Sequence, residues 1–247
     1  MYILAFETTG AFASAALADE KGVISYVQGK DRFSHLQNLM PQTEQVIHEG
    51  GITLKELAAI AVSKGPGSFT GIRIGVSSAR ALSQALDIPC VGVSSLEALA
   101  LNAAAAAEEG ALICPVLDAR RSQVYGGGYL IKDGFPEEII KAAPYTIEEF
   151  MGKVAEYDRI LMLGDGTDAC GEIIEKLRPA GRETAKEAVR YQKADSVARL
   201  ALKIFREEGG VPYGRLQPEY MRVAEAERRL AEKRKAQGKG ALQKEEK

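Results

Sequence analysis

The stretch AAIAVSKGPGSFTGIRIGVSSARALSQAL, residues 58–86, predicts a strand, a turn and a helix in that order. Its apolar start, Ala58–Val62, is typical of a buried strand. The segment that follows, Gly65–Gly71, is rich in glycine, and the apolar residues after it recur at helical spacing to about Leu86. A strand, a tight turn and a helix in succession favour a mixed α/β fold.

The glycine-rich turn allows a sharp bend of the backbone. Gly65 and Gly67 can adopt conformations in which a side chain would clash, and Ser68 or Thr70 can cap the helix. The turn is not a Walker loop, because Lys64 precedes the glycines and no Gly-Lys-Ser/Thr follows them. It is not the dinucleotide fingerprint either, because Thr70 stands where the third glycine would fall.

The helix carries small side chains on one face, at Gly71, Gly75 and Ala79, which we call the small-residue face. Glycine inside a helix costs ~1 kcal/mol relative to alanine, so a compensating contact is expected. Three interpretations remain open. The N–H groups at the helix start bind an anion, the face docks another helix, or the turn and face pack inside the protein's own core.

The composition indicates a globular protein with room for one large or two small cores, since the 247 residues are 46% hydrophobic and 27% charged. The net charge of −2 gives no overall attraction to nucleic acid. Cys90, Cys114 and Cys170 are widely spaced, which favours buried free thiols in a reducing compartment. The start, MYILAFETTG, lacks a signal-peptide pattern, and the run Leu96–Ala107 is too short to span a bilayer. We therefore expect a cytoplasmic protein with no membrane partner.

The order of elements indicates a duplication. The first half reads as β-β-β-α-β-α-β-α, and the second half restarts with the apolar strand Ala111–Leu117 and a returning strand at Gln123–Ile131. A strand, a Gly-x-Gly turn and a helix recur over residues 159–177. Two halves with one plan indicate a duplicated domain.

The predicted domains are an N-terminal lobe at 1–109, a C-terminal lobe at 110–222 and a charged tail at 223–247, which is either a solvated helix or disordered. The remaining predicted segments are a helix at Ser34–Glu49 capped by Ser34, a helix at Ser95–Glu109, a helix at Thr146–Glu156 with a capping box, a polar surface connection at Arg178–Lys193, a helix at Ser196–Glu208 and an extended segment at Pro212–Arg222.

Two carboxylates and two glycine-rich turns are the candidates for chemistry. Glu7 and Asp118 each follow an apolar strand, and such carboxylates facing across a cleft suit Mg²⁺–phosphate chemistry, because hard cations take oxygen ligands. The alternative is that each carboxylate only caps the next turn. The glycines of both turns would lie at the same cleft, which gives these nucleotide-binding candidates: Glu7, Gly65, Gly67, Asp118, Gly164 and Gly166.

No other catalytic constellation can be assembled from the sequence. His35 and His48 have no Cys or Asp at ligand spacing, so a surface or helix-cap position is favoured for His35. No Ser-His-Asp or Cys-His set is found. Tyr, Phe and Arg are scattered, so no RNA-binding platform is predicted. We predict no catalytic residue and no metal site.

Seven stretches resemble the TsaB (YeaZ) family in the family's order over about residues 2–222. They are SKGPGSFTGIRIG (63–75), which is the specific signature, ILAFETT (3–9), RFSHLQNLMP (32–41), VSSLEALA (93–100), LDARRSQVY (117–125), GDG (164–166) and QPEYMR (217–222). The resemblance implies a duplicated, ribonuclease H-like two-lobed fold of the actin, hexokinase and Hsp70 type (ASKHA).

The resemblance also implies a function. TsaB-like proteins are non-catalytic partners of a related subunit, TsaD, which transfers a threonylcarbamoyl group to the adenosine 3′ of the anticodon in tRNAs reading ANN codons. An ATPase, TsaE, joins them. We therefore expect an activating subunit that binds no cofactor tightly, with ATP or ADP, Mg²⁺ and tRNA entering through the complex. The alternative is an ATP-binding or ATP-hydrolysing enzyme that uses Glu7, Asp118 and the glycine-rich turns.

Two positions depart from the relatives. The catalytic relative holds a metal with a His-x-x-x-His pair on its first helix, whereas in this chain the residue four positions after His35 is Leu39. At the second position, Glu7 stands where the family usually has Asp. The family pairs through the first two helices of the N-terminal lobe, and in isolation the same surface could form a homodimer. The implied partner interface is Leu36, Leu39, Met40, Gly71, Ile72, Gly75, Val76 and Ala79.

Overall fold

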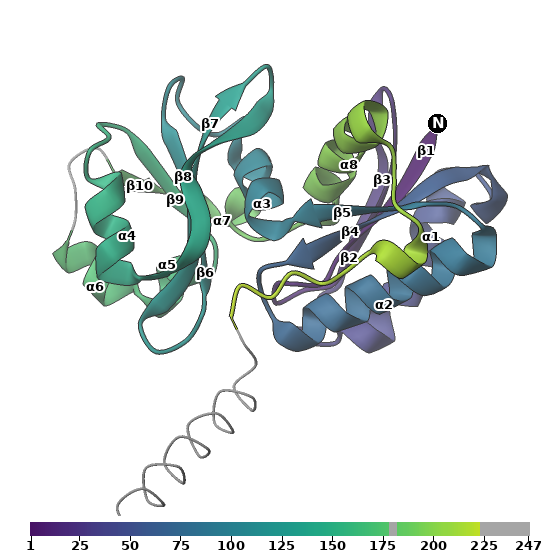
Figure 1. The fold of residues 1–247 in the computed structure, drawn as a ribbon, viewed down its shortest axis with the longest axis horizontal. Helices are drawn as coiled ribbons and strands as arrows, with labels where there is room; N and C mark the ends of the chain where they lie inside the picture. The colour runs from purple at the N-terminus through teal and green to yellow at the C-terminus, as the bar shows by residue number, and fades with distance from the viewer. Residues whose placement is uncertain (178–181, 223–247) are drawn as a thin grey trace, which may run out of the picture.

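Two five-stranded sheets, each flanked by helices, form the two lobes of the molecule (Figure 1). The computed structural model describes residues 1–177 and 182–222. We call the part built on the first sheet the first lobe and the part built on the second sheet the second lobe.

The first sheet has the strand order β3-β2-β1-β4-β5. Its central strand, β1, pairs antiparallel with β2 and parallel with β4, while β3 and β5 form the edges. The strands are β1 (Tyr2–Glu7), β2 (Ser14–Asp19), β3 (Gly22–Gln28), β4 (Leu57–Gly65) and β5 (Cys90–Ser94). The predicted strand at the start of residues 58–86 is therefore confirmed as β4, which is longer than predicted at both ends.

The second sheet has the order β10-β9-β6-β7-β8 and repeats the pairing of the first. Its central strand, β6, pairs antiparallel with β7 and parallel with β9, as β1 does with β2 and β4. The strands are β6 (Leu112–Asp118), β7 (Gln123–Lys132), β8 (Phe135–Thr146), β9 (Ile160–Leu163) and β10 (Arg182–Thr184). The duplication is confirmed, and the topology is the duplicated ribonuclease H-like fold.

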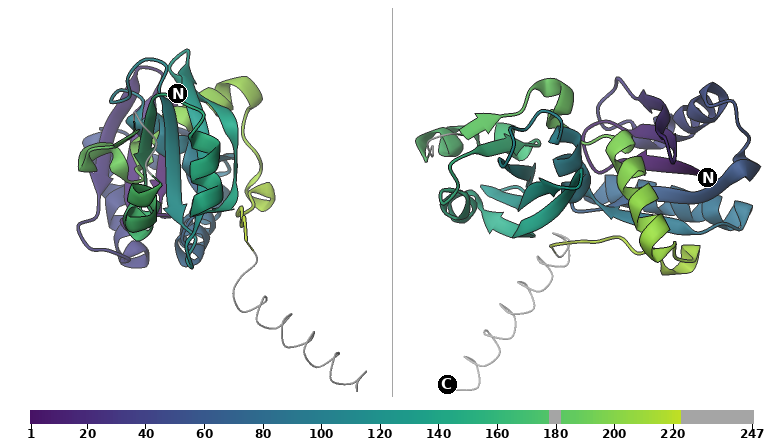
Figure 2. Two further views of the ribbon diagram at one scale, coloured as in Figure 1. Left: turned by 90° about the vertical axis from the view of Figure 1, so that its left-hand side faces the viewer. Right: turned by 90° about the horizontal axis from the view of Figure 1, so that it is seen from above.

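Side chains of the first sheet alternate between two apolar layers, as the two-residue period of a strand requires. Leu4 and Phe6 pack with α1 and α2, whereas Ile3 and Ala5 pack with α8. The ribbon views show helices on both faces of this sheet (Figure 2). These helices are α1 (His35–Glu49), α2 (Phe69–Leu86) and α8 (Ala194–Glu208). Because helices cover both faces, β1 is apolar at nearly every position rather than at alternate ones.

The helix α3 (Ser95–Ala103) lies between the two sheets. Ala98 and Leu101 belong to the apolar cluster of the first sheet, and Leu96 and Leu99 belong to a cluster with strands of the second. A helix that packs on all sides must be apolar all round, which explains the alanine-rich sequence. The helix ends at Ala103 and not at Glu109 as predicted, because the residues that follow form turns.

The second lobe contributes shorter helices. Thr146 forms the predicted capping box at the start of α4, with its Oγ1 accepting from Glu149 N at 3.2 Å and Glu149 Oε2 accepting from Thr146 N at 3.0 Å. The helices are α4 (Ile147–Val154), α5 (Gly166–Ala169), α6 (Gly171–Lys176) and α7 (Glu187–Arg190), and the 3₁₀ helices of the chain are η1 (Leu54–Glu56) and η2 (Tyr213–Arg215).

The assignment of residues 110–222 to one C-terminal lobe is wrong for α8. Val197 and Ala201 of α8 lie in one cluster with Ile3 and Ala16 of the first sheet, because the apolar stripe of this helix covers β1 and β2. The first lobe is therefore built from two chain segments, and the second lobe is inserted between them.

Residues 209–222, which we call the strap, run back along the first lobe and reach the second (Figure 1). Val211 bridges Cys90 through two backbone hydrogen bonds of 2.8 Å, and Leu216 is buried in the first lobe. At the other end, Arg222 Nη1 donates to Ala119 O of the second lobe at 2.7 Å. The predicted extended segment is confirmed, apart from the short helix η2.

Three further predictions concern segments near the helices. Ser34 precedes α1 as predicted, but its side chain makes no capping hydrogen bond. The predicted surface connection at 178–193 contains β10 and α7, and its Ala185 and Gln192 are buried. Residues 178–181 and the predicted tail at 223–247 lie outside the described residues.

Candidate functional site

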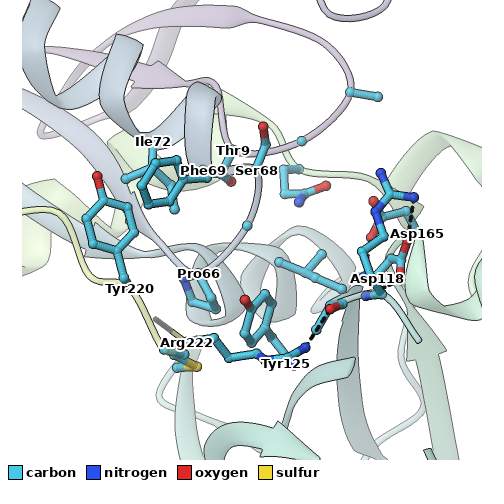
Figure 3. Close-up of a pocket in the computed structure, with 18 of the residues that line it drawn as sticks. Thr9, Pro66, Ser68, Phe69, Ile72, Asp118, Tyr125, Asp165, Tyr220 and Arg222 are labelled. Atoms are coloured by element: carbon cyan, nitrogen blue, oxygen red, sulfur yellow. Dashed lines mark hydrogen bonds and ion pairs between the residues drawn. The ribbon is translucent and has the colours of Figure 1, made fainter. Parts of the chain in front are cut away.

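A cavity of about 540 Å³ lies between the lobes, and we call it the interlobe cleft (Figure 3). The first lobe, the second lobe and the strap each contribute residues to its lining. The first lobe contributes residues 9–11, 32–33, 66–69 and 72. The second lobe contributes residues 117–121, 125, 165 and 192, and the strap contributes residues 219–222. The cleft thus collects the ends of β1, β4, β6 and β9, where the loops after parallel strands meet.

The first-lobe wall depends on a close approach between β1 and the start of α2. A Cβ atom on Gly71 would lie 1.9 Å from Thr8 O, and Thr8 Oγ1 donates to Gly71 O at 2.7 Å. Gly67 has a φ of +150°, and Ser68 N donates to Thr9 O at 2.9 Å. Ser68 Oγ accepts from Gly71 N at 3.2 Å, which confirms the predicted cap. Only glycine fits at position 71, so the sequence brings the two segments into contact at the cleft.

The second-lobe wall repeats this construction. Gly164 has a φ of +97°, and its Cβ would lie 2.1 Å from Val116 O at the end of β6. Asp165, the next residue, faces the cleft, and its Oδ1 accepts from Asp118 N at 3.0 Å. Burial is the main cause that raises the pKa of the Asp165 carboxyl. In both lobes a glycine lets the turn after the second parallel strand contact the end of the first strand.

The other carboxylates of the cleft are paired with cations. Asp118 Oδ2 lies 3.1 Å from Arg120 Nη1, and Asp118 Oδ1 accepts from Arg120 N at 2.7 Å. Glu219 Oε2 lies 3.0 Å from Lys64 Nζ, and Glu219 N donates to Lys64 O at 2.7 Å. These pairs satisfy the carboxylates within the chain itself.

Aromatic side chains of the strap and of α2 form one rim of the cleft. The rings of Phe69 and Tyr220 have centroids 4.6 Å apart, and the Arg73 guanidinium carbon lies 4.0 Å from the centroid of Phe69. Arg73 Nε donates to Tyr220 Oη at 3.1 Å. Tyr125 of β7 lies across the cleft from this group (Figure 3).

Comparison with known proteins places the chain in a family. A family model described as TsaD, tRNA N6-adenosine threonylcarbamoyltransferase, matches residues 30–230. A relative from Bacillus subtilis, the tRNA threonylcarbamoyladenosine biosynthesis protein TsaB, is 34% identical over 236 residues, which cover 95% of this chain and 100% of the relative. The chain belongs to the TsaB family.

Other TsaB relatives and solved structures agree with this assignment. The TsaB protein of Escherichia coli is 34% identical over 130 residues, covering 52% of this chain and 55% of that protein. A Pseudomonas aeruginosa structure described as an uncharacterized protein with similarity to peptidase YEAZ has a TM-score of 0.75 at 27% identity, and covers 90% of this chain and 99% of its own. The structure of YeaZ from the same organism has a TM-score of 0.72 at 27% identity, and the match covers 89% of this chain and 99% of YeaZ.

Only part of the predicted nucleotide set reaches the cleft of this TsaB-family chain. Gly67 and Asp118 line it. Gly65, Gly164 and Gly166 lie outside the lining and serve backbone approaches: a Cβ on Gly65 would lie 2.3 Å from Glu219 O of the strap, and one on Gly166 would lie 2.8 Å from Val116 O. Their neighbours Pro66 and Asp165 do line the cleft, so both turns lie there as expected, and nucleotide binding by these glycines stays a prediction.

Glu7 is also outside the cleft, because its side chain is fully buried at the end of β1. Its Oε1 accepts from Thr9 N at 2.5 Å and from Thr9 Oγ1 at 2.6 Å, and its Oε2 accepts from Ser63 Oγ. Burial raises the pKa of the Glu7 carboxyl, while these hydrogen bonds act in the opposite direction. The carboxylate therefore ties β1 to its own turn and to β4, which agrees with the capping alternative.

The small-residue face is not exposed in this TsaB-family chain. Gly75 is buried, and a Cβ there would lie 2.4 Å from Thr8 Oγ1 and 3.1 Å from Val62 Cγ2. Of the predicted interface residues, six are buried in the first lobe: Leu39, Gly71, Ile72, Gly75, Val76 and Ala79. Their placement on a docking surface is wrong, because the face lets α2 pack on the protein's own β1 and β4. Leu36, at 76% exposed, and Met40, at 38%, do lie at the surface, and their contact with a partner stays a prediction.

The histidine and cysteine predictions have mixed outcomes. Of the two positions predicted for His35, the surface is wrong, because the residue is buried, at 3% exposed, whereas it does lie at the start of α1. Burial lowers its pKa and favours the neutral ring. Leu39, one turn later, packs in the apolar core. Within residues 1–177 and 182–222, no group of three or more His, Cys, Asp and Glu side chains could hold a metal ion. Cys90, Cys114 and Cys170 are buried free thiols, as predicted.

Phe33, Phe69, Tyr125 and Tyr220 line the cleft, but none of them was singled out by spacing. Phe69 lies within the signature and Tyr220 within the QPEYMR stretch, so the resemblance to TsaB was the only signal that could have found them. In the same described part of the chain, no helix combines the length and the apolar character needed to cross a membrane.

Proposed function

We propose that this TsaB-family chain is a non-catalytic subunit that binds and activates TsaD for threonylcarbamoyl transfer to the adenosine 3′ of the anticodon in tRNAs reading ANN codons. The observation that carries the proposal is the match to a protein named for tRNA threonylcarbamoyladenosine biosynthesis over 95% of this chain. The match of the TsaD family model to residues 30–230 supports a subunit related in sequence to its own catalytic partner.

The state of the carboxylates supports an activating role over the alternative of an ATP-hydrolysing enzyme. Glu7 is fully buried and accepts three hydrogen bonds from its own chain. Asp118 reaches the cleft but is ion-paired with Arg120. A Mg²⁺–phosphate site needs accessible oxygen ligands, and these two carboxylates are held by other contacts.

The exposed apolar side chains of α1 are the surface that we propose for TsaD. Leu36 and Met40 lie four residues apart, so they share one face of the helix. They are 76% and 38% exposed, and burying an apolar side chain of this size stabilises an interface by roughly 1.5–3 kcal/mol. In isolation the same two side chains could pair with a second copy of the chain, which gives a homodimer.

The remaining partners follow from the same proposal. TsaE joins the complex, and tRNA is its substrate. The chain itself binds no cofactor tightly, and ATP or ADP with Mg²⁺ enters through the complex. Such a subunit would work in the cytoplasm.

The first test is a reconstituted modification assay with TsaD, TsaE, tRNA and the substrates of the reaction. Leaving out this chain should abolish formation of threonylcarbamoyladenosine, because TsaD then lacks its activator. Undiminished turnover without the chain would reject the proposal.

The second test locates the contact. Leu36→Glu and Met40→Glu should each weaken binding of TsaD by roughly tenfold or more, measured by calorimetry or size-exclusion chromatography, because a charge replaces buried apolar surface. The matched control is Ile139→Glu in β8 of the second lobe, where the original side chain is 42% exposed. Wild-type affinity in both α1 variants would exclude this face.

A further inference from the structure

The fold collects aromatic side chains that are scattered in the sequence. Phe33 precedes α1, Phe69 begins α2, Tyr125 lies in β7 and Tyr220 lies in the strap, yet all four line the interlobe cleft. Phe33, Phe69 and Tyr220 remain 67%, 37% and 37% exposed. Phe69 and Tyr220 already pack against each other and against Arg73, so the largely exposed ring of Phe33 offers the flat face on which another ring can stack.

Arginine side chains accompany these rings. The guanidinium carbon of Arg32 lies 5.7 Å from the ring centroid of Phe33, at one side of the cleft. Arg222 enters from the strap and donates to Ala119 O (Figure 3). Within residues 1–177 and 182–222, neither guanidinium lies within ion-pair distance of a carboxylate. Their positive charge is therefore available to an anionic ligand.

The carboxylates of the cleft do not cancel this charge. Asp118 is paired with Arg120 and Glu219 with Lys64, at 3.1 Å and 3.0 Å. The third carboxylate, Asp165, accepts a hydrogen bond from Asp118 N. Two of the three cleft carboxylates are thus ion-paired, and burial raises the pKa of the third, Asp165, which favours its neutral form.

We propose that the interlobe cleft binds an unpaired segment of RNA, with a base stacked on the aromatic side chains and its phosphates held by Arg32 and Arg222. Unpaired bases stack on aromatic side chains and on arginine planes in RNA-binding proteins, while arginines neutralise the backbone. The cavity of about 540 Å³ has the size of a site for one small ligand or nucleotide. A free nucleoside triphosphate is less suited, because Asp118 and Glu219, two of the three cleft carboxylates that could hold its Mg²⁺, are already ion-paired. The identity of the RNA as tRNA rests on the proposed function.

The test measures binding of an unmodified tRNA transcript to the full chain alone and to its complex with TsaD. Phe33→Ala and Arg32→Ala change exposed side chains, so both variants should fold. Each should weaken tRNA binding by about tenfold, which is the scale of one lost stacking or phosphate contact. Arg32→Ala should also reduce the salt dependence, by about 0.7 to 1 in the slope of log affinity against log salt concentration, whereas Phe33→Ala should leave the slope unchanged.

Arg206→Ala on α8 and Tyr213→Ala in η2 are the matched controls, because both side chains are exposed and lie outside the cleft lining. Wild-type tRNA affinity for both cleft variants, alone and in the complex, would overturn the proposal. Displacement of tRNA by ATP with Mg²⁺ at equal concentration would also overturn it, since a free nucleotide would then be the ligand. Failure of this proposal can be distinguished from failure of the proposed function. If the proposed function is wrong, the chain does not bind TsaD, or TsaD turns over without it, and tRNA binding by the isolated chain can still be measured.

Discussion

Gly71→Ala should destabilise the protein, although alanine is the better helix former. The added Cβ would lie 1.9 Å from Thr8 O, whereas real Cβ contacts are essentially never under 3.0 Å. The backbone at the end of β1 would therefore have to move by about 1.1 Å, the difference between these values. Overpacking of this kind costs ~1–3 kcal/mol, and the hydrogen bond from Thr8 Oγ1 to Gly71 O, worth ~1 kcal/mol, would be strained or lost.

The higher helix propensity of alanine stabilises the variant by ~1 kcal/mol, so the net decrease in the free energy of unfolding is ~1–3 kcal/mol. For a chain of this size that loss lowers the melting temperature by roughly 2–4 °C per kcal/mol. Urea or thermal unfolding followed by circular dichroism measures it. Gly152→Ala in α4 is the matched control, because nothing lies within 4 Å of the new Cβ, and it should stabilise the protein by ~0.5–1 kcal/mol.

Opposite signs for the two glycines are the decisive outcome. If Gly71→Ala were as stable as the wild type, the contact between β1 and α2 would be looser than the structure describes. A larger side chain at Gly75 should act in the same way, disrupting the fold itself rather than blocking a partner.

Three other substitutions test single side chains. Because the folded pKa of Glu7 is raised above 4.5, the carboxyl favours folding most below that pH, and this contribution is lost as the pH rises through the folded pKa. The stability of Glu7→Gln relative to the wild type should therefore improve from acidic to neutral pH in denaturant titrations, and a constant difference would contradict the assignment. Thr146→Ala should cost ~1 kcal/mol by removing the cap of α4, whereas Ser34→Ala, where no capping hydrogen bond exists, should change the unfolding free energy little; equal losses would refute the distinction.

The local elements were predictable because their signals are local. The Ser68 cap and the Thr146 capping box each depend on residues three positions apart, and the structure contains both. The duplicated plan was also visible, since an apolar strand followed by a returning strand is a short-range pattern. The C-terminal end of α3 could not be predicted, because the alanine-rich residues that follow Ala103 are compatible with both a helix and a turn.

The contacts of these elements could not be derived in the same way. Spacing shows that Gly71 and Gly75 share a helix face, but a partner helix and the protein's own sheet both require small residues there. The contact that shows the face to be covered by the protein's own sheet is made by Thr8, which lies 63 positions from Gly71 in the sequence. Likewise, the sequence of an amphipathic helix such as α8 predicts an apolar stripe, but it does not show which of the two sheets the stripe covers.

The four aromatic residues of the cleft illustrate the same limit. Phe33 and Tyr220 are far apart in the chain, and no periodicity connects them. Both line the interlobe cleft, because the strap brings Tyr220 to Phe69 at the start of α2. A sequence count of Tyr, Phe and Arg therefore underestimates what a two-lobed fold can gather at one place.

The insertion of the second lobe between β5 and α8 imposes an order on synthesis. Ile3 and Ala5 leave the ribosome early, but Val197 and Ala201, which cover them, are made only after the whole second lobe. Until then one apolar side of the first sheet has no cover from α8, which exposes the nascent chain to aggregation. A fragment that stops before Ala194 should therefore be insoluble or bound by chaperones, even though it contains every strand of both sheets.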